Sequence, residues 1–118
     1  MKEAKFTDPI FEAGIVLTYG DMKDMNDWYR SRGYPEGINN NWQAFCEKID
    51  KKNGVRIYHI HFEAYGFTTV VHETNHLTFN ILNDRGIPFI EETKEVFAYY
   101  QDWVAGKCRD YLEVWTKK

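Results

Sequence analysis

Two histidines four residues apart, with a glutamate directly after the first, are the strongest chemical signal in the sequence. His72, Glu73 and His76 lie in the stretch TTVVHETNHLTF, residues 68–79. Residues four apart lie one above the other on a helix, so both imidazoles can reach one metal ion. Glu73 is rotated by about 100° from His72, which keeps its carboxylate off the ion and beside a water that the ion activates. The pattern is typical of a catalytic Zn²⁺ site with two ligands and a general base.

The residues around this pattern predict an amphipathic helix that ends at Gly86. The apolar residues that would face the core are Val70, Val71, Leu77, Ile81 and Leu82. The polar arc opposite them consists of His72, Glu73, His76 and Asn80. Asn75 falls nearer the apolar arc, and we interpret it as a buried amide bonded to backbone. The bland alternative is a solvated polar face that happens to carry two histidines.

A third ligand has to come from elsewhere in the chain, because a catalytic zinc ion usually has three protein ligands and one open position. The acidic candidates downstream are Asp84, Glu91, Glu92 and Glu95. Asp84 lies too near the end of the helix to fold back easily, and Glu91 and Glu92 suit the first turn of a second helix. Glu95 follows His76 after eighteen residues, a length that allows the chain to turn and return beside the site.

HETNH followed by EVFAYY resembles the gluzincin branch of the zincin metallopeptidases, in which a glutamate on the following helix is the third zinc ligand. The stretch 70–104 is also similar to very small phage- and prophage-encoded zincin-like proteins, and the likeness covers about residues 55–105. The resemblance implies that His72, His76 and Glu95 bind Zn²⁺ and that Glu73 is the catalytic base. It also implies a zincin-like fold, with the strand before the helix at the sheet edge, where substrate backbone would bind by strand addition.

Four other residues are weaker candidates for the same site. Asp102 shares a helix face with Glu95 and could accept the second N–H of a zinc-binding histidine, or be a surface aspartate. Tyr99 could supply its phenol to a developing oxyanion, or lie in the core. His59 and His61 would share one face of a strand. One of them could stabilise an oxyanion near the zinc, but we expect a solvated strand face, and a second metal site made by this pair alone would be weak.

The order of the elements predicts one α+β domain over residues 1–118. We expect a strand within 9–20, a short helix at 21–33, a loop at 34–41 and a hairpin over 42–63 that turns at Asn53-Gly54. Two helices should follow at 66–86 and 91–115. The expected architecture is a minimal zincin-like fold, with a small antiparallel sheet of about three strands packed with the two helices.

The composition limits the classes of partner and the cellular location that we expect. The net charge of −3 argues against a nucleic-acid partner, since phosphate binding favours a basic face. The chain contains no apolar run long enough for a membrane span and no apolar segment of a signal peptide near its start, so we expect a cytoplasmic protein, in the host cytoplasm if it is phage-encoded. Cys46 and Cys108 form no CxxC pair, and we interpret them as reduced thiols, although sequence alone leaves a disulfide open.

These observations predict a zinc-dependent metallopeptidase-like protein that hydrolyses a peptide or protein substrate. Glu73 would act as general base on a zinc-bound water. Compared with large gluzincins the sequence is small, and we expect it to lack a separate C-terminal domain that closes a deep cleft. A catalytically weak or inactive binding or assembly protein with structural zinc is therefore the alternative function. The oligomeric state is left open.

Overall fold

The structure is a computed structural model that describes residues 1–31, 44–50 and 54–117. The elements in these ranges are β1 (Lys2–Thr7), β2 (Gly14–Tyr19), α1 (Met22–Ser31), β3 (Ala44–Asp50), β4 (Arg56–Phe62), α2 (Phe67–Asp84) and α3 (Lys94–Thr116). The α+β class is confirmed, as are the short first helix, the β3–β4 hairpin and the two C-terminal helices. The predicted loop at 34–41 and residue Asn53 of the hairpin turn lie outside the described residues.

The sheet is mixed and, over the described residues, has the strand order β1-β2-β4-β3. β1 pairs antiparallel with β2, β3 pairs antiparallel with β4, and the central pair β2–β4 is parallel. The prediction of an antiparallel sheet of about three strands is therefore wrong. It missed β1, whose sequence KEAKFT carries three charged residues because the strand lies at an exposed edge. β4 is an interior strand, so its predicted place at the sheet edge is also wrong, and β3 is the edge strand beside it.

Residues 9–13, which were predicted to begin a strand, instead form a turn organised by a buried carboxylate. Asp8 is 1% exposed, and its side chain accepts the backbone N–H groups of Ile10 and Ala13, each at 2.9 Å. The hydroxyl of Tyr100 donates to the same carboxylate at 3.0 Å. A buried carboxylate needs such hydrogen-bond partners. The bond from Tyr100 links the β1–β2 connection to α3.

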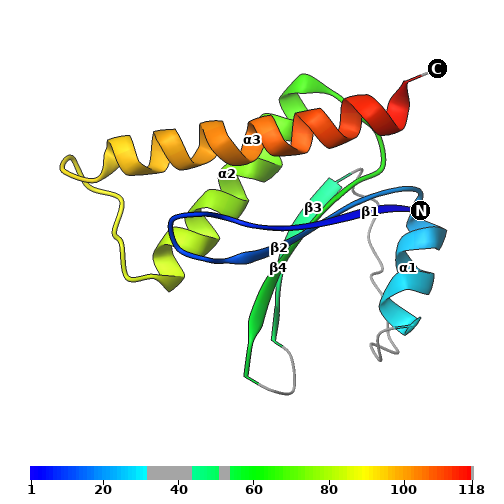
Figure 1. Cartoon of the computed structure of the whole chain (residues 1–118), viewed down its shortest axis with the longest axis horizontal. Helices are drawn as coiled ribbons and strands as arrows, with labels where there is room; N and C mark the ends of the chain where they lie inside the picture. The colour runs from blue at the N-terminus through cyan, green and yellow to red at the C-terminus, as the bar shows by residue number, and fades with distance from the viewer. Residues whose placement is uncertain (32–43, 51–53, 118) are drawn as a thin grey trace.

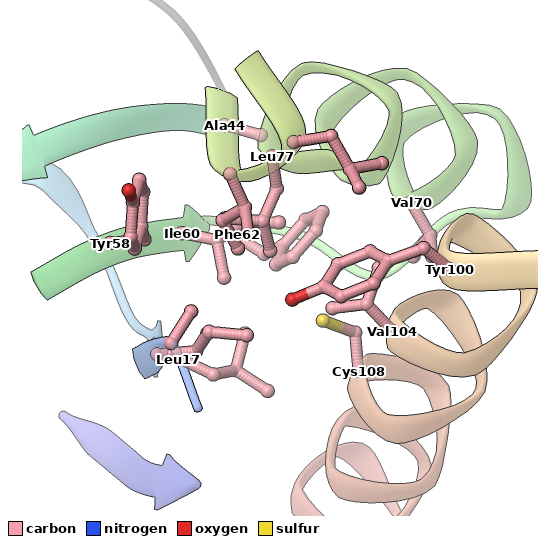
Figure 2. Packing of buried hydrophobic residues seen from close by; sticks show 14 of the residues in the cluster. Leu17, Ala44, Tyr58, Ile60, Phe62, Val70, Leu77, Tyr100, Val104 and Cys108 are labelled. Carbon is pink, nitrogen blue, oxygen red and sulfur yellow. The ribbon is translucent and has the colours of Figure 1, made fainter. Parts of the chain in front are cut away.

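One face of the sheet packs against α2 and α3, which cross each other on the same side of the molecule (Figure 1). Leu17 and Ile60 are side by side in the β2–β4 register, and both are fully buried beneath the helices. Leu77 from α2 and Val104 from α3 reach the same cluster, as Figure 2 shows. This cluster is the larger of the two hydrophobic cores among the described residues.

The other face of the sheet is covered by α1, which lies apart from the two long helices (Figure 1). Met25, Trp28 and Tyr29 of α1 are buried there with Val16 and other apolar residues. His59 and His61 point to the same face, because alternate residues of β4 project to opposite sides. Both histidines are fully buried. The prediction of a solvated strand face is wrong, since α1 covers it.

α2 and α3 end close to their predicted bounds. Gly86 has φ +77, a conformation that favours glycine, and it follows the last turn of α2. Gly54 has φ +82 at the end of the hairpin turn. Asn75 is exposed, so its prediction as a buried amide is wrong. In the part of the chain that the structure describes, neither long helix is apolar enough to cross a membrane.

The C-terminal end of α2 is fastened to the β3–β4 hairpin through Asp84. Its carboxylate accepts the hydroxyl of Tyr58 at 2.6 Å and forms ion pairs with Lys48 and Arg56, each at 2.9 Å. Burial raises the pKa of Asp84, but these partners outweigh it and hold the value at about 2. The residues around a cavity of about 500 Å³ at this end are Asp50, Gly54, Arg56, Tyr58, Asp84 and Arg85. Arg56 also pairs with Asp50 at 2.6 Å, so charges at this cavity neutralise one another.

Leu77→Ala should lower the free energy of unfolding by about 2–5 kcal/mol, because the side chain is fully buried where α2 meets the sheet. Urea denaturation followed by circular dichroism measures the loss. Val71→Ala is the matched control on the same helix, since Val71 is 41% exposed and should change the value by no more than about 0.5 kcal/mol. Equal losses in the two variants would contradict this packing.

Candidate metal centre

The packing of α2 on the sheet fixes the direction in which its polar residues point. The buried residues of the helix are Val70, Glu73, Thr74, Leu77, Thr78, Ile81 and Leu82. Thr74 and Thr78 tolerate burial because their hydroxyls donate to helix carbonyls four residues back, at 2.6 and 2.7 Å. His72 and His76 lie on the opposite, exposed side. The exposed histidine face is as predicted, but Val71, predicted to face the core, is 41% exposed, and Glu73, predicted on the polar arc, is buried.

The two exposed imidazoles converge. Nε2 of His72 and Nε2 of His76 are 3.2 Å apart, and the rings meet edge to face with centroids separated by 4.7 Å. Two nitrogens bound tetrahedrally to Zn²⁺ at ~2.0–2.1 Å are separated by about 3.3–3.4 Å. The spacing of the pair is thus close to the bite that a tetrahedral zinc ion requires. The same distance also allows one imidazole to donate a hydrogen bond to the other.

Glu73 lies beside the imidazole pair and is shielded from solvent, with 7% of the residue exposed. One ligand atom from each of His72, Glu73 and His76 lies within 4.8 Å of the others. Burial raises the pKa of Glu73 above its usual value, and the two histidines partly oppose that shift. The structure therefore brings a carboxylate shielded from solvent next to two imidazole nitrogens. The sequence predicted that these groups lie together but not that Glu73 is buried.

Cys46 of the edge strand β3 lies near Glu73, a neighbour that the sequence analysis missed. Asn80, two turns along α2 from Glu73, donates to the thiol of Cys46 on β3 at 3.7 Å. Burial raises the pKa of Cys46 to about 12, the Asn80 bond opposes this, and the nearby Glu73 carboxylate raises it further. Cys46 and Cys108 are both free thiols, in agreement with the prediction. The contact between Asn80 and Cys46 depends on how β3 pairs with β4 and lies beside α2. The sequence alone does not determine that pairing.

Glu95 does not belong to the cluster. Among the residues that the structure describes, the group of potential ligand atoms contains His72, Glu73 and His76 alone. Glu95 is exposed in the first turn of α3, and Phe97, two residues later, is 3% exposed. Positions two apart on a helix differ by about 200°, so burying Phe97 turns Glu95 outward.

An aromatic cluster determines this rotation of α3. Phe97 packs against Phe79 of α2 with ring centroids 4.8 Å apart. Phe89, in the connection between the helices, contacts Phe79 at 5.2 Å and Phe97 at 5.0 Å. The three rings hold the start of α3 against the C-terminal half of α2. Ligation by Glu95 remains a prediction that requires its side chain, or the first turn of α3, to move toward the histidines.

The two weaker candidates on α3 are also exposed. Tyr99 is 70% exposed, so the alternative that it lies in the core is wrong, and Tyr100 is the buried tyrosine. Asp102 is exposed, and over the described residues the structure shows no hydrogen bond from either imidazole to it. The oxyanion role of Tyr99 and the supporting role of Asp102 therefore stay predictions.

The donor set fits a zinc ion. Imidazole nitrogen and carboxylate oxygen are both zinc ligands, and the exposed imidazoles leave space for further ligands on the solvent side. His72 and His76 would hold the ion. Glu73 follows His72 by one residue, so its side chain points toward β3 rather than in the same direction as the imidazoles. From there it would lie beside the ion and could accept a proton.

Comparison of the chain with protein-family models, with curated proteins and with solved structures found no match. The site is therefore interpreted from its own geometry.

Zinc affinity should depend on both imidazoles. His76→Ala should weaken binding by about 100-fold or more, since loss of even a hydrogen-bonding partner of a ligand costs ~10–100-fold. Competition with a chromophoric chelator measures the affinity. The prediction that Glu95 is the third ligand requires a comparable loss in Glu95→Gln. Asp110→Asn, an exposed change farther along α3, is the control, and a Glu95→Gln protein that binds like this control would exclude Glu95.

Proposed function

We propose that this protein is a zinc-dependent, metallopeptidase-like hydrolase that cleaves peptide bonds. The single observation that carries the proposal is the arrangement on α2, where two imidazole nitrogens 3.2 Å apart lie beside the shielded carboxylate of Glu73. A separation that suits a metal ion and a carboxylate shielded from solvent occur together at this place. A hydrolytic metal site needs both.

The chemistry divides between the ion and the chain. Zn²⁺ bound at this position would act as a Lewis acid, lowering the pKa of a water toward ~7 and polarising a substrate carbonyl. His72 and His76 would hold the ion on the exposed side of α2. Glu73 accepts the proton of the attacking water and delivers it to the leaving amine, so that the carboxylate is regenerated at the end of the reaction.

The surroundings of α2 support the same proposal. β3 is an edge strand that runs antiparallel to β4 and packs beside α2, on the side where Glu73 lies. An edge strand offers unpaired backbone groups to an extended peptide. A peptide bound along β3 would lie near the general base. The resemblance placed the substrate on the strand before α2, which is the interior strand β4, so the proposed binding edge moves to β3.

A second candidate function is a binding or assembly protein with structural zinc, and the position of Glu95 favours it. Both imidazoles are exposed, and the predicted third ligand lies outside their cluster. A metal ion held by two histidines of α2 could complete its coordination with groups from a partner protein. The ion would then stabilise an interface rather than activate water.

Glu73→Gln should retain zinc binding and lose hydrolysis, because the amide keeps the shape of the side chain but cannot accept the proton. The expected decrease in kcat is about 10²–10⁴-fold. Cleavage of a broad peptide library, followed by mass spectrometry, measures hydrolysis, and metal content is measured on the same samples. Glu63→Gln is the matched control at a carboxylate outside the cluster.

Full activity of Glu73→Gln would rule out the proposed role of Glu73. Absence of zinc-dependent cleavage by the unaltered protein, together with zinc-dependent association with itself or another protein, would favour the assembly function instead.

A further inference from the structure

β1 is the outer strand at one edge of the sheet, and β3 is the outer strand at the other. Among the described residues, no strand pairs with the outer side of β1. Ala4 and Phe6 are half-buried and point to the face of the sheet that α3 covers. Glu3 and Lys5 are exposed and point to the opposite face, where α1 lies. The hydrolysis proposed at α2 uses none of these residues.

The outward backbone groups of β1 belong to its odd-numbered residues. The N–H of Asp8 donates to the carbonyl of Ala13 at 3.2 Å, which continues the β1–β2 pairing by one residue. Opposite residues of an antiparallel pair alternate between hydrogen-bonded and non-hydrogen-bonded positions. The even-numbered residues of β1 therefore bond to β2, and the N–H and C=O groups of Glu3, Lys5 and Thr7 point away from it.

Charge and backbone direction together select one register in which a second copy of β1 can pair antiparallel with this edge. Outward groups meet only when odd-numbered residues of the two copies lie opposite each other. Pairing Glu3 with Glu3, or Lys5 with Lys5, would place like charges directly opposite, which destabilises a sheet. Pairing Glu3 with Lys5 places opposite charges together twice, because a two-fold axis relates the copies. That axis passes between the two Ala4 residues, whose small side chains permit close approach.

Charges on an edge strand usually oppose pairing, but the positions of Glu3 and Lys5 favour this register. The Trp28 indole donates to the Glu3 carboxylate at 2.6 Å and holds it against the sheet. The Lys5 ammonium lies 3.7 Å from the same carboxylate, and its side chain is 68% exposed. Two copies in this register would place two lysines and two glutamates on one face, so that each carboxylate has two ammonium neighbours.

An apolar side of α3 adds to the edge. A strand edge alone buries too little surface for a stable dimer, so neighbouring side chains must contribute. α3 extends beside β1 (Figure 1), and Trp103 contacts Phe6 with ring centroids 6.0 Å apart. Val96 and Val114 lie within about 20° of Trp103 around the helix, on the side that faces β1. Val96 is 40% exposed and Val114 is 70% exposed. These side chains give a partner apolar surface next to the strand.

We propose that a second copy of this chain binds along β1, so that two sheets join into one continuous sheet across a two-fold axis. The strand order would be β3-β4-β2-β1 in one copy, continued by β1-β2-β4-β3 in the other. The pairing leaves β3, the edge proposed for the substrate, open in each copy. It does not depend on the metal centre, and either proposal can be disproved alone.

Sedimentation equilibrium of the full chain tests the association, with a chelator present to prevent bridging by zinc. The mass should rise with concentration toward twice the 14.1 kDa of one chain. Lys5→Glu places two carboxylates opposite each other and should raise the dissociation constant of the dimer by about tenfold or more. Lys94→Glu makes the same change of charge on the side of α3 away from Val96, and this control should leave the dissociation constant unchanged. The mass of a single chain at every concentration would overturn the proposal.

Lys5→Pro tests whether the backbone of β1 forms the interface. Proline removes the outward N–H of Lys5 but no hydrogen bond to β2, so the chain should fold with an unchanged circular dichroism spectrum and stay monomeric. A dimer of unaltered affinity in Lys5→Pro would overturn the proposal. The same result in Lys5→Glu would do so even if Lys5→Pro failed to fold.

Hydrogen exchange measured by nuclear magnetic resonance tests the register. The amides of Glu3 and Lys5 should exchange more slowly as the protein concentration rises, because they become bonded only in the dimer. The amides of Ala4 and Phe6, which bond to β2, should be protected at every concentration. A dimer in which exchange at Lys5 does not slow has another interface and would refute the proposal.

Discussion

The rotation of α2 about its own axis is the constraint on which the rest of the candidate metal centre depends. Burying Val70, Leu77 and Ile81 against the sheet leaves one orientation for the helix. His72 and His76 then point to solvent, four residues and one turn apart, and their nitrogens converge. Glu73 is carried to the flank that faces β3 and becomes desolvated without being displaced from the imidazoles. The same hydrophobic burial that stabilises the fold therefore brings the two imidazoles together and places Glu73 beside them.

β4 presents different kinds of residue to the two faces of the sheet. Tyr58, Ile60 and Phe62 point to the core beneath α2 and α3, and the alternate residues His59 and His61 point to α1. Because β4 is an interior strand with both faces covered, its polar residues cannot be solvated and must be hydrogen-bonded. The Thr18 hydroxyl on the neighbouring strand meets both imidazoles. A short parallel pairing between β2 and β4 thus produces a buried polar chain that two separated segments could not form alone.

The start of α3 shows packing and ligation in competition. Apolar burial of Phe97 against Phe79 and Phe89 sets the rotation of the first turn, and this rotation points Glu95 outward. Burial of three aromatic rings in contact stabilises this arrangement more than an ion pair between one exposed carboxylate and other solvent-exposed groups would. A metal ion changes that balance, because a carboxylate bound to it contributes to a far stronger interaction. The position of Glu95 is therefore the feature of the site that a bound ion is best placed to alter.

The sequence by itself determined the features that depend on local periodicity. It predicted α2 and α3, the β3–β4 hairpin, the histidine face and the position of Glu73 beside it, since each depends on residues within a few turns of one another. Tertiary structure decided the rest. The edge strand β1, the interior place of β4, the burial of His59 and His61, the exposure of Asn75 and Tyr99, and the outward direction of Glu95 all depend on which elements cover one another. Coverage arises from contacts between residues distant in the chain, and a pattern of apolar and polar residues does not record which partner will lie on each face.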